Sequence, residues 1–441
     1  YDRYLFSVNG RVDGSSRFGG NNKYGFFPSG SVAWRISEEG FMEPVKAVIN
    51  NLKLRTSYGF TGNTEIGVYE SLATLGSNSW TIGNQLVSGF YPNRIPNPDL
   101  KWEKTGQFDI GFDLGLFNNR LRLTADYYYK KTTDLLYNVA IPSASGYDSM
   151  LKNIGSVQNK GYELSIESDN LSGAFSWTTA FNISFNRNKV LELGGETYKD
   201  VGTYDDHLKT SDIRRLIVGQ PIGVFYGYRF DGIFQNEAEC AQQTSSPSPI
   251  GVGLRRYKDL NGDGKIDATN DREILGDANP KFFGGMTNTF AYKGFELNVF
   301  LQYSYGNKIF NYNAMELESP TGGQNVYQDL VNRWTPTNPS NEYQKATTNR
   351  NNIVSDRFIE DGSFLKLKTV SLSYSFPKLN WKHIGGLRLY VTGQNLLTWT
   401  KYRGYDPEVS YRGASTLEAG EDFGGYPQAR TFMFGIKLDI K

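Results

Sequence analysis

The sequence contains little cysteine, little histidine and no long hydrophobic run. Cys240 is the only cysteine among 441 residues, so neither an intrachain disulfide nor a cluster of thiolate ligands can form. No stretch reaches the roughly 18 apolar residues of a transmembrane helix. Lys and Arg total 47 and Asp and Glu total 46, so a bulk electrostatic partner such as nucleic acid is not expected.

Motifs for common enzyme chemistry are also missing. The sequence has no GxSxG, Walker or GxGxxG motif and no Ser/His/Asp order, and its two histidines have no partner at ligand spacing. Glu163 and Glu167 could suggest glycoside hydrolysis, but in a strand they would lie roughly 13 Å apart, too far for either mechanism. We therefore predict that the protein is not an enzyme.

Aromatic residues and glycine are abundant instead. Apolar residues make up only 38%, whereas aromatics reach 15%, with 29 Tyr, 28 Phe, 7 Trp and 48 Gly. A transmembrane β-barrel has this composition, because only every second wall residue meets lipid and aromatic girdles mark both membrane interfaces.

Twelve segments alternate between apolar and polar residues with the period of a strand. Each segment is about twice as long as a strand of a soluble protein, which usually has about five to six residues. Tilted membrane-spanning strands have this greater length. The segments are 3–14, 24–36, 50–61, 104–116, 120–134, 158–170, 174–187, 281–293, 294–306, 362–376, 386–399 and 429–441.

The alternation assigns side chains to two faces. We expect one apolar set to face lipid: Phe108, Phe112, Leu297, Leu301, Phe432 and Phe434. We expect a charged set to face inward: Asp109, Asp113, Arg122, Asp126, Glu163, Glu167, Glu296 and Arg388. The inward set could line a substrate path. A hydrated lumen wall needs polar residues in any case, so we favour the interpretation that these residues simply form such a wall.

The connections fall into two classes. Short ones occur at Asn118-Asn119, at 169–173 and at Lys293-Gly294, and long ones cover 62–103, 188–280, 307–361 and 400–428. Short periplasmic turns alternating with long external loops are typical of outer-membrane barrels. The apolar run 224–234 resembles a strand, but counting it would break this alternation, so we place it within the external excursion 188–280.

A plugged import barrel has about 22 strands, so this all-β sequence is expected to supply about the last 12 of a transmembrane antiparallel barrel. It opens in what reads as mid-strand, without a signal peptide, which predicts a processed or incomplete chain whose plug domain is absent.

An ordered set of phrases along the sequence resembles the SusC/RagA family of TonB-linked outer-membrane transporters. The phrases include VDGSSRFGGNNKYGFFPSGSVAWRISEEGFM (12–42), LKLRTSYGFTGN (52–63), PNPDLKWEKTGQFDIGFDLGLFNNRLRLTADYYYKKTTDLL (96–136), GQPIGVFYGYRFDGIFQ (219–235), DLNGDGKID (259–267), FIEDGSFLKLKTVSLSYSFP (358–377) and LYVTGQNLLTWTKYRGYDPE (389–408). The resemblance implies a 22-stranded barrel with a plug, a SusD-like surface lipoprotein as lid, and energy from TonB. The expected function is active import of a nutrient across the outer membrane of a Gram-negative bacterium, with oligosaccharide the first expectation for the cargo and peptide the next.

One loop matches the start of an EF-hand. Oxygen ligands for Ca²⁺ would come from Asp259, Asn261 and Asp263, the Lys265 carbonyl and Asp267. The closing acid is shifted, because Asn270 holds the twelfth position and Asp271 follows it. The alternative is an Asx-rich turn that needs no metal; a bound metal would stiffen an external loop.

Aromatic residues in the long connections could contact the cargo or the lid. They are Trp80, Tyr91, Trp334, Tyr402, Tyr405, Tyr411 and Tyr426. Loop packing or the aromatic girdle is the more common role for such residues. Two other classes of protein also fit the alternation: a surface-exposed all-β binding or adhesive protein, and part of a passive porin with an open lumen.

Overall fold

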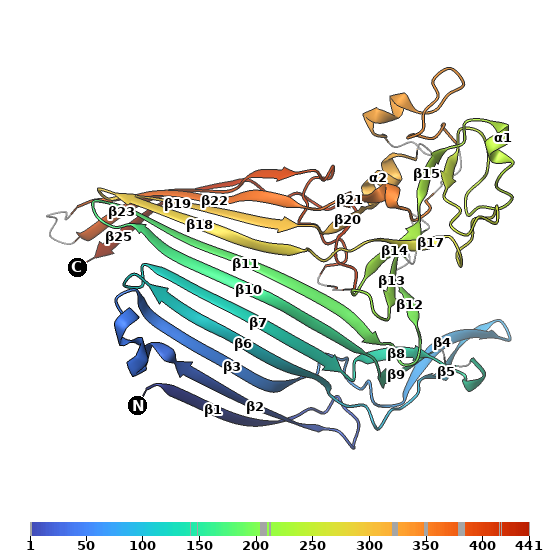
Figure 1. Ribbon diagram of the computed structural model, residues 1–441. Helices are drawn as coiled ribbons and strands as arrows, with labels where there is room; N and C mark the ends of the chain where they lie inside the picture. Colours follow the sequence, from blue (N-terminus) through green and yellow to red (C-terminus); the bar gives the residue numbers. More distant parts are fainter. Residues whose placement is uncertain are drawn as a thin grey trace. The chain divides into compact units, whose positions relative to one another are not determined.

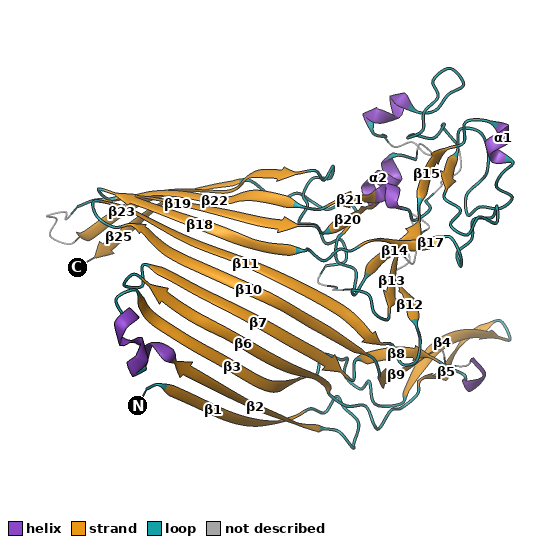
Figure 2. Ribbon diagram, in the orientation of Figure 1, coloured by secondary structure: helices purple, strands orange, loops and turns teal. Residues whose placement is uncertain are grey.

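The computed structural model describes residues 2–141, 143–147, 149–202, 210, 213–319, 325–347, 352–377, 384–413, 415 and 417–440. Strands dominate and the helices are short (Figure 2). Within these ranges, no helix combines the length and the apolar character that crossing a membrane requires.

Twelve of the described strands form one sheet, with hydrogen-bonded neighbours in the order β1-β2-β3-β6-β7-β10-β11-β18-β19-β22-β23-β25 (Figure 1). Their bounds are β1 Tyr4–Gly14, β2 Tyr24–Arg35, β3 Ile49–Asn63, β6 Glu103–Leu116, β7 Leu121–Thr133, β10 Ser156–Leu171, β11 Phe175–Glu192, β18 Phe282–Tyr292, β19 Phe295–Tyr305, β22 Phe364–Ser375, β23 Ile384–Thr400 and β25 Thr431–Ile440. Each lies on one of the twelve predicted segments, so the predicted all-β antiparallel fold is confirmed.

Tight turns set the register of the hairpins. Lys293 and Gly294 have φ of 46° and 88°, and they join Tyr292 to its partner Phe295. Two consecutive residues at positive φ match the right-handed twist of the strands they connect. Asn118 and Asn119, both at φ 59°, occupy the turn after β6, where asparagine tolerates the left-handed region.

The six side chains expected to face lipid are all at least partly exposed. Phe434, for example, is 81% exposed. A two-layer sandwich would have buried them, so the finding supports a wall one sheet thick.

The chain divides into two compact units. The first comprises Tyr1–Ile166 and Asn186–Thr197, and the second comprises Glu167–Phe185 and Tyr198–Lys441. The first unit also holds two separate hairpins: β4 Thr74–Ile82 with β5 Gln85–Arg94, and β8 Leu136–Ala140 with β9 Ser149–Asn153.

In the second unit, the long connections fold into smaller sheets of their own: β12-β13-β14-β17, β15-β16 and β21-β20-β24. These strands are β12 Tyr198–Val201, β13 Arg214–Ile217, β14 Val224–Tyr228, β15 Phe230–Ile233, β16 Arg255–Tyr257, β17 Arg272–Gly276, β20 Lys308–Asn311, β21 Ile359–Asp361 and β24 Glu421–Asp422. The helices among the described residues are α1 Glu237–Cys240 and α2 Tyr312–Leu317, with 3-10 turns η1 Ile36–Glu38, η2 Gly40–Val45, η3 Ser143–Ser145, η4 Gln328–Asn332 and η5 Asp356–Phe358.

A hydrophobic core lies among these connections, which are together called the loop body (described residues of 198–280, 307–361 and 400–428). Its buried members are Ile213, Phe225, Phe310, Tyr312, Ala314, Met315, Val354 and Phe358. They come from both 188–280 and 307–361, two segments expected only as long excursions. The apolar run 224–234 forms β14 and β15 here, outside the twelve-stranded sheet, as the alternation of short and long connections requires.

Candidate functional site

The polar face of the sheet in the first unit carries charges that neutralise one another. Arg55 lies between two carboxylates, with Nη1 2.6 Å from Asp126 Oδ1 and Nε 3.4 Å from Asp113 Oδ1. Lys53 Nζ lies 3.8 Å from Asp113 Oδ2. The carboxylates were expected on this face, but their cationic partners were not. Lys53 and Arg55 are two positions apart in the predicted strand 50–61, so they share one face of it. This spacing could have predicted them as inward-facing cations.

The same compensation occurs on the sheet of the second unit. Arg388 Nη2 lies 2.6 Å from Glu296 Oε1 and donates to Ser373 Oγ at 2.7 Å. Arg122, in the first unit, donates to the Asn119 carbonyl at 2.8 Å. The ion pairs leave a polar, hydrated face without a strong field of one sign.

A hollow of about 500 Å³ opens on the polar face of β1, β2, β3 and β6 in the first unit. Small residues form its floor and polar side chains form its rim. It is called the inner-face hollow, and its lining includes Asn9, Ser29, Ser31, Ser57, Gly59, Gln107 and Asp109.

The acidic loop residues Asp406 and Glu408 form ion pairs with the sheet of the second unit. Lys366 Nζ, on β22, lies 2.6 Å from both Asp406 Oδ1 and Glu408 Oε2, and Lys368 Nζ lies 3.0 Å from Glu408. Burial alone would raise the pKa of Glu408, but the two ammonium groups outweigh it and hold the pKa below its usual value. The segment around Glu408 is therefore held to the strand by charge.

The EF-hand-like loop is folded by hydrogen bonds to its own backbone. Asp259 accepts from the N–H groups of Gly262 at 2.6 Å and Gly264 at 2.7 Å. Both glycines have φ of 76°, which the tight loop requires. Asn261 accepts from Asp263 N at 3.2 Å, and Asp263 accepts from Lys265 N at 2.8 Å. These contacts bring the predicted ligands into one loop in the geometry of Asx turns.

The two later acids of the loop have different surroundings. Asp271 is buried, and its oxygens accept from the N–H groups of Leu260 and Asp267, each at 2.8 Å, so it closes the base of the loop. Hydrogen bonds from the N–H groups of Asn270 and Thr269 lower the pKa of Asp267. Over the described ranges, no group of three or more His, Cys, Asp and Glu side chains is arranged to hold a metal ion. The oxygen-rich donor set suits a hard cation in chemical type, with Asn261 and the Lys265 carbonyl as further ligands.

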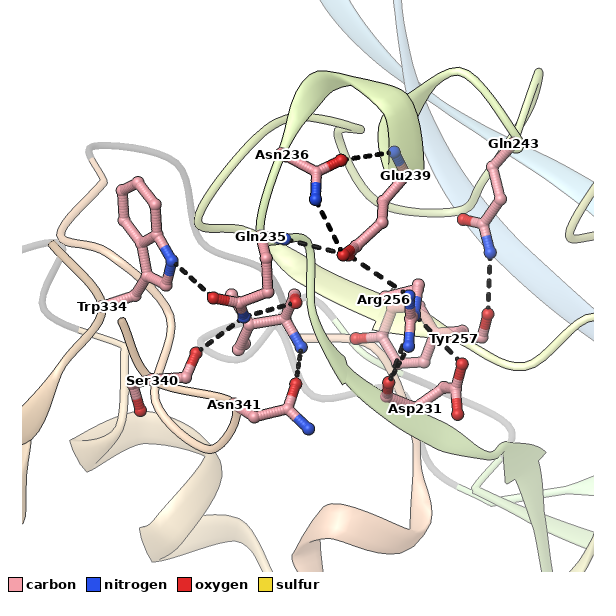
Figure 3. A network of polar contacts seen from close by, with 11 residues as sticks. Asp231, Gln235, Asn236, Glu239, Gln243, Arg256, Tyr257, Trp334, Ser340 and Asn341 are labelled. Atoms are coloured by element: carbon pink, nitrogen blue, oxygen red, sulfur yellow. Dashed lines mark hydrogen bonds and ion pairs between the residues drawn. The ribbon is translucent and has the colours of Figure 1, made fainter. Parts of the chain in front are cut away.

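A second polar network joins two of the long connections (Figure 3). Gln235 accepts from Trp334 Nε1 at 3.1 Å and donates to the Ser340 carbonyl at 3.0 Å. Asn341 accepts from Ile233 N at 2.9 Å. The network lines a shallow hollow of about 420 Å³. Its polar groups are used in bonds between 233–235 and 334–341, so its evident role is to join the two segments.

Arg256 extends this network on the other side, as Figure 3 shows. Its Nε lies 3.0 Å from Asp231 Oδ2, and its Nη1 lies 3.3 Å from Glu239 Oε2. Glu239 also accepts from Gln235 N at 3.0 Å. Burial raises the pKa of the neighbouring Tyr257 to about 12, so its hydroxyl stays neutral.

Buried ion pairs hold the loop body together. Glu318 is within 4 Å of three guanidinium groups: Arg357 at 2.7 Å, Arg403 at 3.3 Å and Arg255 at 3.7 Å. The three arginines come from three different long connections. Sequence reasoning missed this site, because nothing local marks these residues as buried.

A second buried pair joins Arg214 to Glu421 at 2.9 Å. Burial lowers the pKa of Arg214 and raises that of Glu421, so desolvation outweighs their mutual attraction. Arg214 also donates to the carbonyls of Gly223 and Ala419.

The aromatic residues expected to contact cargo or lid are placed in different environments. Trp80 and Tyr91 share one face of the β4–β5 hairpin, where they cover Gly89 and Gly76 of the opposite strand. Both rings are exposed.

In the second unit, Tyr405 and Tyr426 are 82% and 92% exposed, whereas Tyr402 is only 5% exposed. Tyr402 donates to Asp422, and burial followed by this hydrogen bond raises its pKa. Tyr402 therefore packs inside the loop body and offers no surface for a ligand. Tyr411 packs on Phe423 with ring centroids 5.4 Å apart, and Trp334 belongs to the network of Figure 3.

Comparison with known proteins gives consistent matches. A family model described as TonB dependent receptor-like, beta-barrel, matches residues 1–237. TonB-dependent receptor P3 of Formosa agariphila is 42% identical over 445 residues, covering 99% of this chain and 44% of that protein. TonB-dependent receptor SusC of Bacteroides thetaiotaomicron is 31% identical over 454 residues, covering 100% of this chain and 42% of that protein. The chain thus spans less than half the length of these curated relatives.

Solved structures agree with these matches. The structure of the RagAB peptide transporter superposes with a TM-score of 0.83 at 28% identity, covering 99% of this chain and 46% of that one. The RagAB peptide importer in its open-open state gives a TM-score of 0.80 at 28% identity, covering 99% and 45%.

Proposed function

Because this chain belongs to the family of TonB-dependent receptor β-barrels, we propose that it is part of a transporter that actively imports a nutrient. The chain is of the SusC/RagA type, and proteins of this type lie in the outer membrane. The observation that best supports import is the two-sided sheet. One face exposes apolar side chains suited to lipid, and the other carries ion pairs and polar groups suited to a hydrated path.

The proposed cargo is an oligosaccharide, with a peptide as the second candidate. The resemblance of the sequence to the SusC/RagA family supports the first, and the likeness to a protein described as a peptide transporter supports the second. The proposed partners are a SusD-like lipoprotein lid and TonB, acting on the full-length protein. Exposed aromatic rings such as Trp80, Tyr91, Tyr405 and Tyr426 are available to stack on sugars or to contact a lid. Import of this kind requires binding of the cargo and a conformational change of the transporter, so we assign no catalytic residue.

Uptake by intact cells tests this function. Cells expressing the full-length protein should consume at least one member of a panel of neutral oligosaccharides and peptides, and deletion of the protein should abolish that uptake. Deletion of TonB should have the same effect, because the import is energised. Uptake that persists without TonB would instead indicate a passive pore.

Labelling tests the sidedness of the connections. Cys240 is only 8% exposed, so the native thiol is a poor probe of 188–280. In a Cys240→Ser background, Glu237→Cys places a thiol at an exposed position of the same excursion. A membrane-impermeant thiol reagent should modify it on intact cells. The control Ser172→Cys, in the short turn between β10 and β11, should react only after the outer membrane is opened; the reverse order would invert the proposed topology.

We also propose that Asp259, Asn261, Asp263, Asp267 and the Lys265 carbonyl hold Ca²⁺. The support is their spacing and their gathering in one tight loop. Asp271 closes the loop from below, and the missing acid at the twelfth position predicts a weak site of about 10⁻⁴–10⁻³ M, as in extracellular modules.

Calorimetry with the full-length protein tests the calcium site. Asp263→Ala should weaken Ca²⁺ binding at least about tenfold, because it removes a charged ligand, whereas the barrel should still fold. The control Glu237→Gln removes an exposed carboxylate from the same excursion and should leave the affinity unchanged. If no heat of binding is measured at millimolar Ca²⁺, the calcium proposal is wrong and the loop is an Asx turn without a metal.

A further inference from the structure

The inner-face hollow arises from strand register in the first unit. The pairing of β2 with β3 sets Ser29 opposite Gly59 and Ser31 opposite Ser57, so four small residues lie side by side on one face. A Cβ added to Gly59 would lie 2.7 Å from the Ser29 Cβ, so the floor stays open only with glycine there. The space of about 500 Å³ is therefore built into the wall.

The rim of the hollow carries planar polar groups held in fixed directions. Asn9 of β1 lies opposite Ser29, and Gln107 and Asp109 of β6 lie opposite Gly59 and Ser57. Gln107 Nε2 donates to Asp109 Oδ2 at 2.7 Å, and Asn9 Nδ2 donates to Ser7 Oγ at 3.0 Å. These bonds orient the amides and leave the Asn9 and Gln107 side-chain carbonyls as acceptors for a ligand.

Arg11 and Phe27 complete the lining at one end of the hollow. Arg11 lies opposite Phe27 in the register and pairs with Asp13 at 2.7 Å. Phe27 is buried, and it packs on Trp102 with ring centroids 5.4 Å apart. One end of the hollow thus combines an aromatic ring with a guanidinium group.

The hollow opens on the face away from lipid. Residues that alternate with its lining, such as Val8 and Phe108, are exposed and apolar on the other face. A ligand in the hollow would therefore lie along the hydrated path of the barrel.

We propose that the inner-face hollow is a binding subsite for a neutral sugar residue of the cargo, an inference that rests on the proposed import function. Amide, carboxylate, guanidinium and hydroxyl groups alternate around it, as neighbouring sugar hydroxyls require donors and acceptors in turn. Arg11 is paired with Asp13, so its guanidinium offers no uncompensated positive charge to an anionic cargo. Asp109 accepts from the neutral Gln107 amide and keeps its carboxylate oxygens as acceptors for sugar hydroxyls. The floor itself is serine and glycine, and the aromatic residues of the lining, Phe27 among them, offer a ring face on which a sugar can stack.

Cysteine protection in the full-length protein tests the subsite. In a Cys240→Ser background, Ser57→Cys places a thiol on the floor, and Ser165→Cys places one on the same polar side of β10, outside the lining. The probe is the neutral oligosaccharide that the cells consume in the uptake assay. At ten times its Kd, it should slow modification of Ser57→Cys about tenfold and leave Ser165→Cys unchanged.

Affinity of the same oligosaccharide gives a second measurement. Asn9→Ala and Gln107→Ala should each raise its Kd about fivefold, because each removes hydrogen-bonding groups from the rim. The matched control Asn298→Ala, on the polar face of β19 in the second unit, should leave the Kd unchanged.

Three outcomes would overturn the inference in distinguishable ways. A Ser57→Cys thiol that is unreactive without ligand would mean that another part of the longer polypeptide fills the hollow. A reactive thiol that the oligosaccharide does not protect, with uptake intact, would remove the subsite but leave the import function. Absence of uptake of every neutral oligosaccharide would overturn the proposed cargo itself.

Discussion

Replacing Glu318 by glutamine should destabilise the loop body by about 3–5 kcal/mol, because it leaves buried guanidinium groups without their main counter-charge. The Glu318 and Arg255 side chains are each only 1% exposed, so water cannot take over the solvation of Arg255. Arg357 and Arg403 also lose a carboxylate partner, and they belong to two different long connections.

The expected result is early opening of the loop body while the sheet persists. Limited proteolysis along a denaturant series should show a lower midpoint for cleavage in 198–280 and 307–361. Glu342→Gln is the matched control, since Glu342 is an exposed carboxylate of the same connection. Equal midpoints for both variants would show that the arginines are solvated by other means.

Val299→Arg should destabilise the barrel by about 2–4 kcal/mol, the cost of a charge at mid-depth on a lipid-facing wall. Val299 lies near the middle of β19, opposite Val370 of β22 and between Leu297 and Leu301 on the same face. Lipid or detergent chains cannot hydrate the guanidinium there.

The unfolding midpoint of the full-length protein in detergent measures this cost. Asn298→Arg is the control, because the next residue of the strand faces the polar side, where Asn298 donates to Thr289 at 2.9 Å. It should change the midpoint much less. Equal losses for both variants would contradict the assignment of faces.

The strands and their faces could be predicted because they depend on local sequence. A strand of one wall puts successive side chains on opposite sides, so the period of two in 294–306 marks both the strand and its lipid face. The turn residues Lys293 and Gly294 give a similar local signal, since positive φ at two successive positions needs glycine or a tolerated substitute.

The candidate sites were predicted less completely. The tight EF-hand-like loop is predictable from spacing, because the residues that form it lie close together in sequence. The sequence suggests that Tyr402 could contact the cargo or the lid, but its ring is buried and its hydroxyl donates to Asp422, twenty positions away. Burial of such a ring depends on which distant segments cover it, and residue type does not reveal that.

The sequence by itself therefore determined the twelve strands, the division of their side chains between two faces and the family. Each of these follows from periodicity, turn chemistry or ordered phrases along the chain. Only the tertiary structure decided that 188–280 and 307–361 share a core, that Glu318 gathers three arginines, and that Ser29, Ser31, Ser57 and Gly59 form one hollow. These features arise from strand register and from contacts between residues far apart in the chain. Such contacts are selected by total burial and charge compensation, which no local pattern encodes.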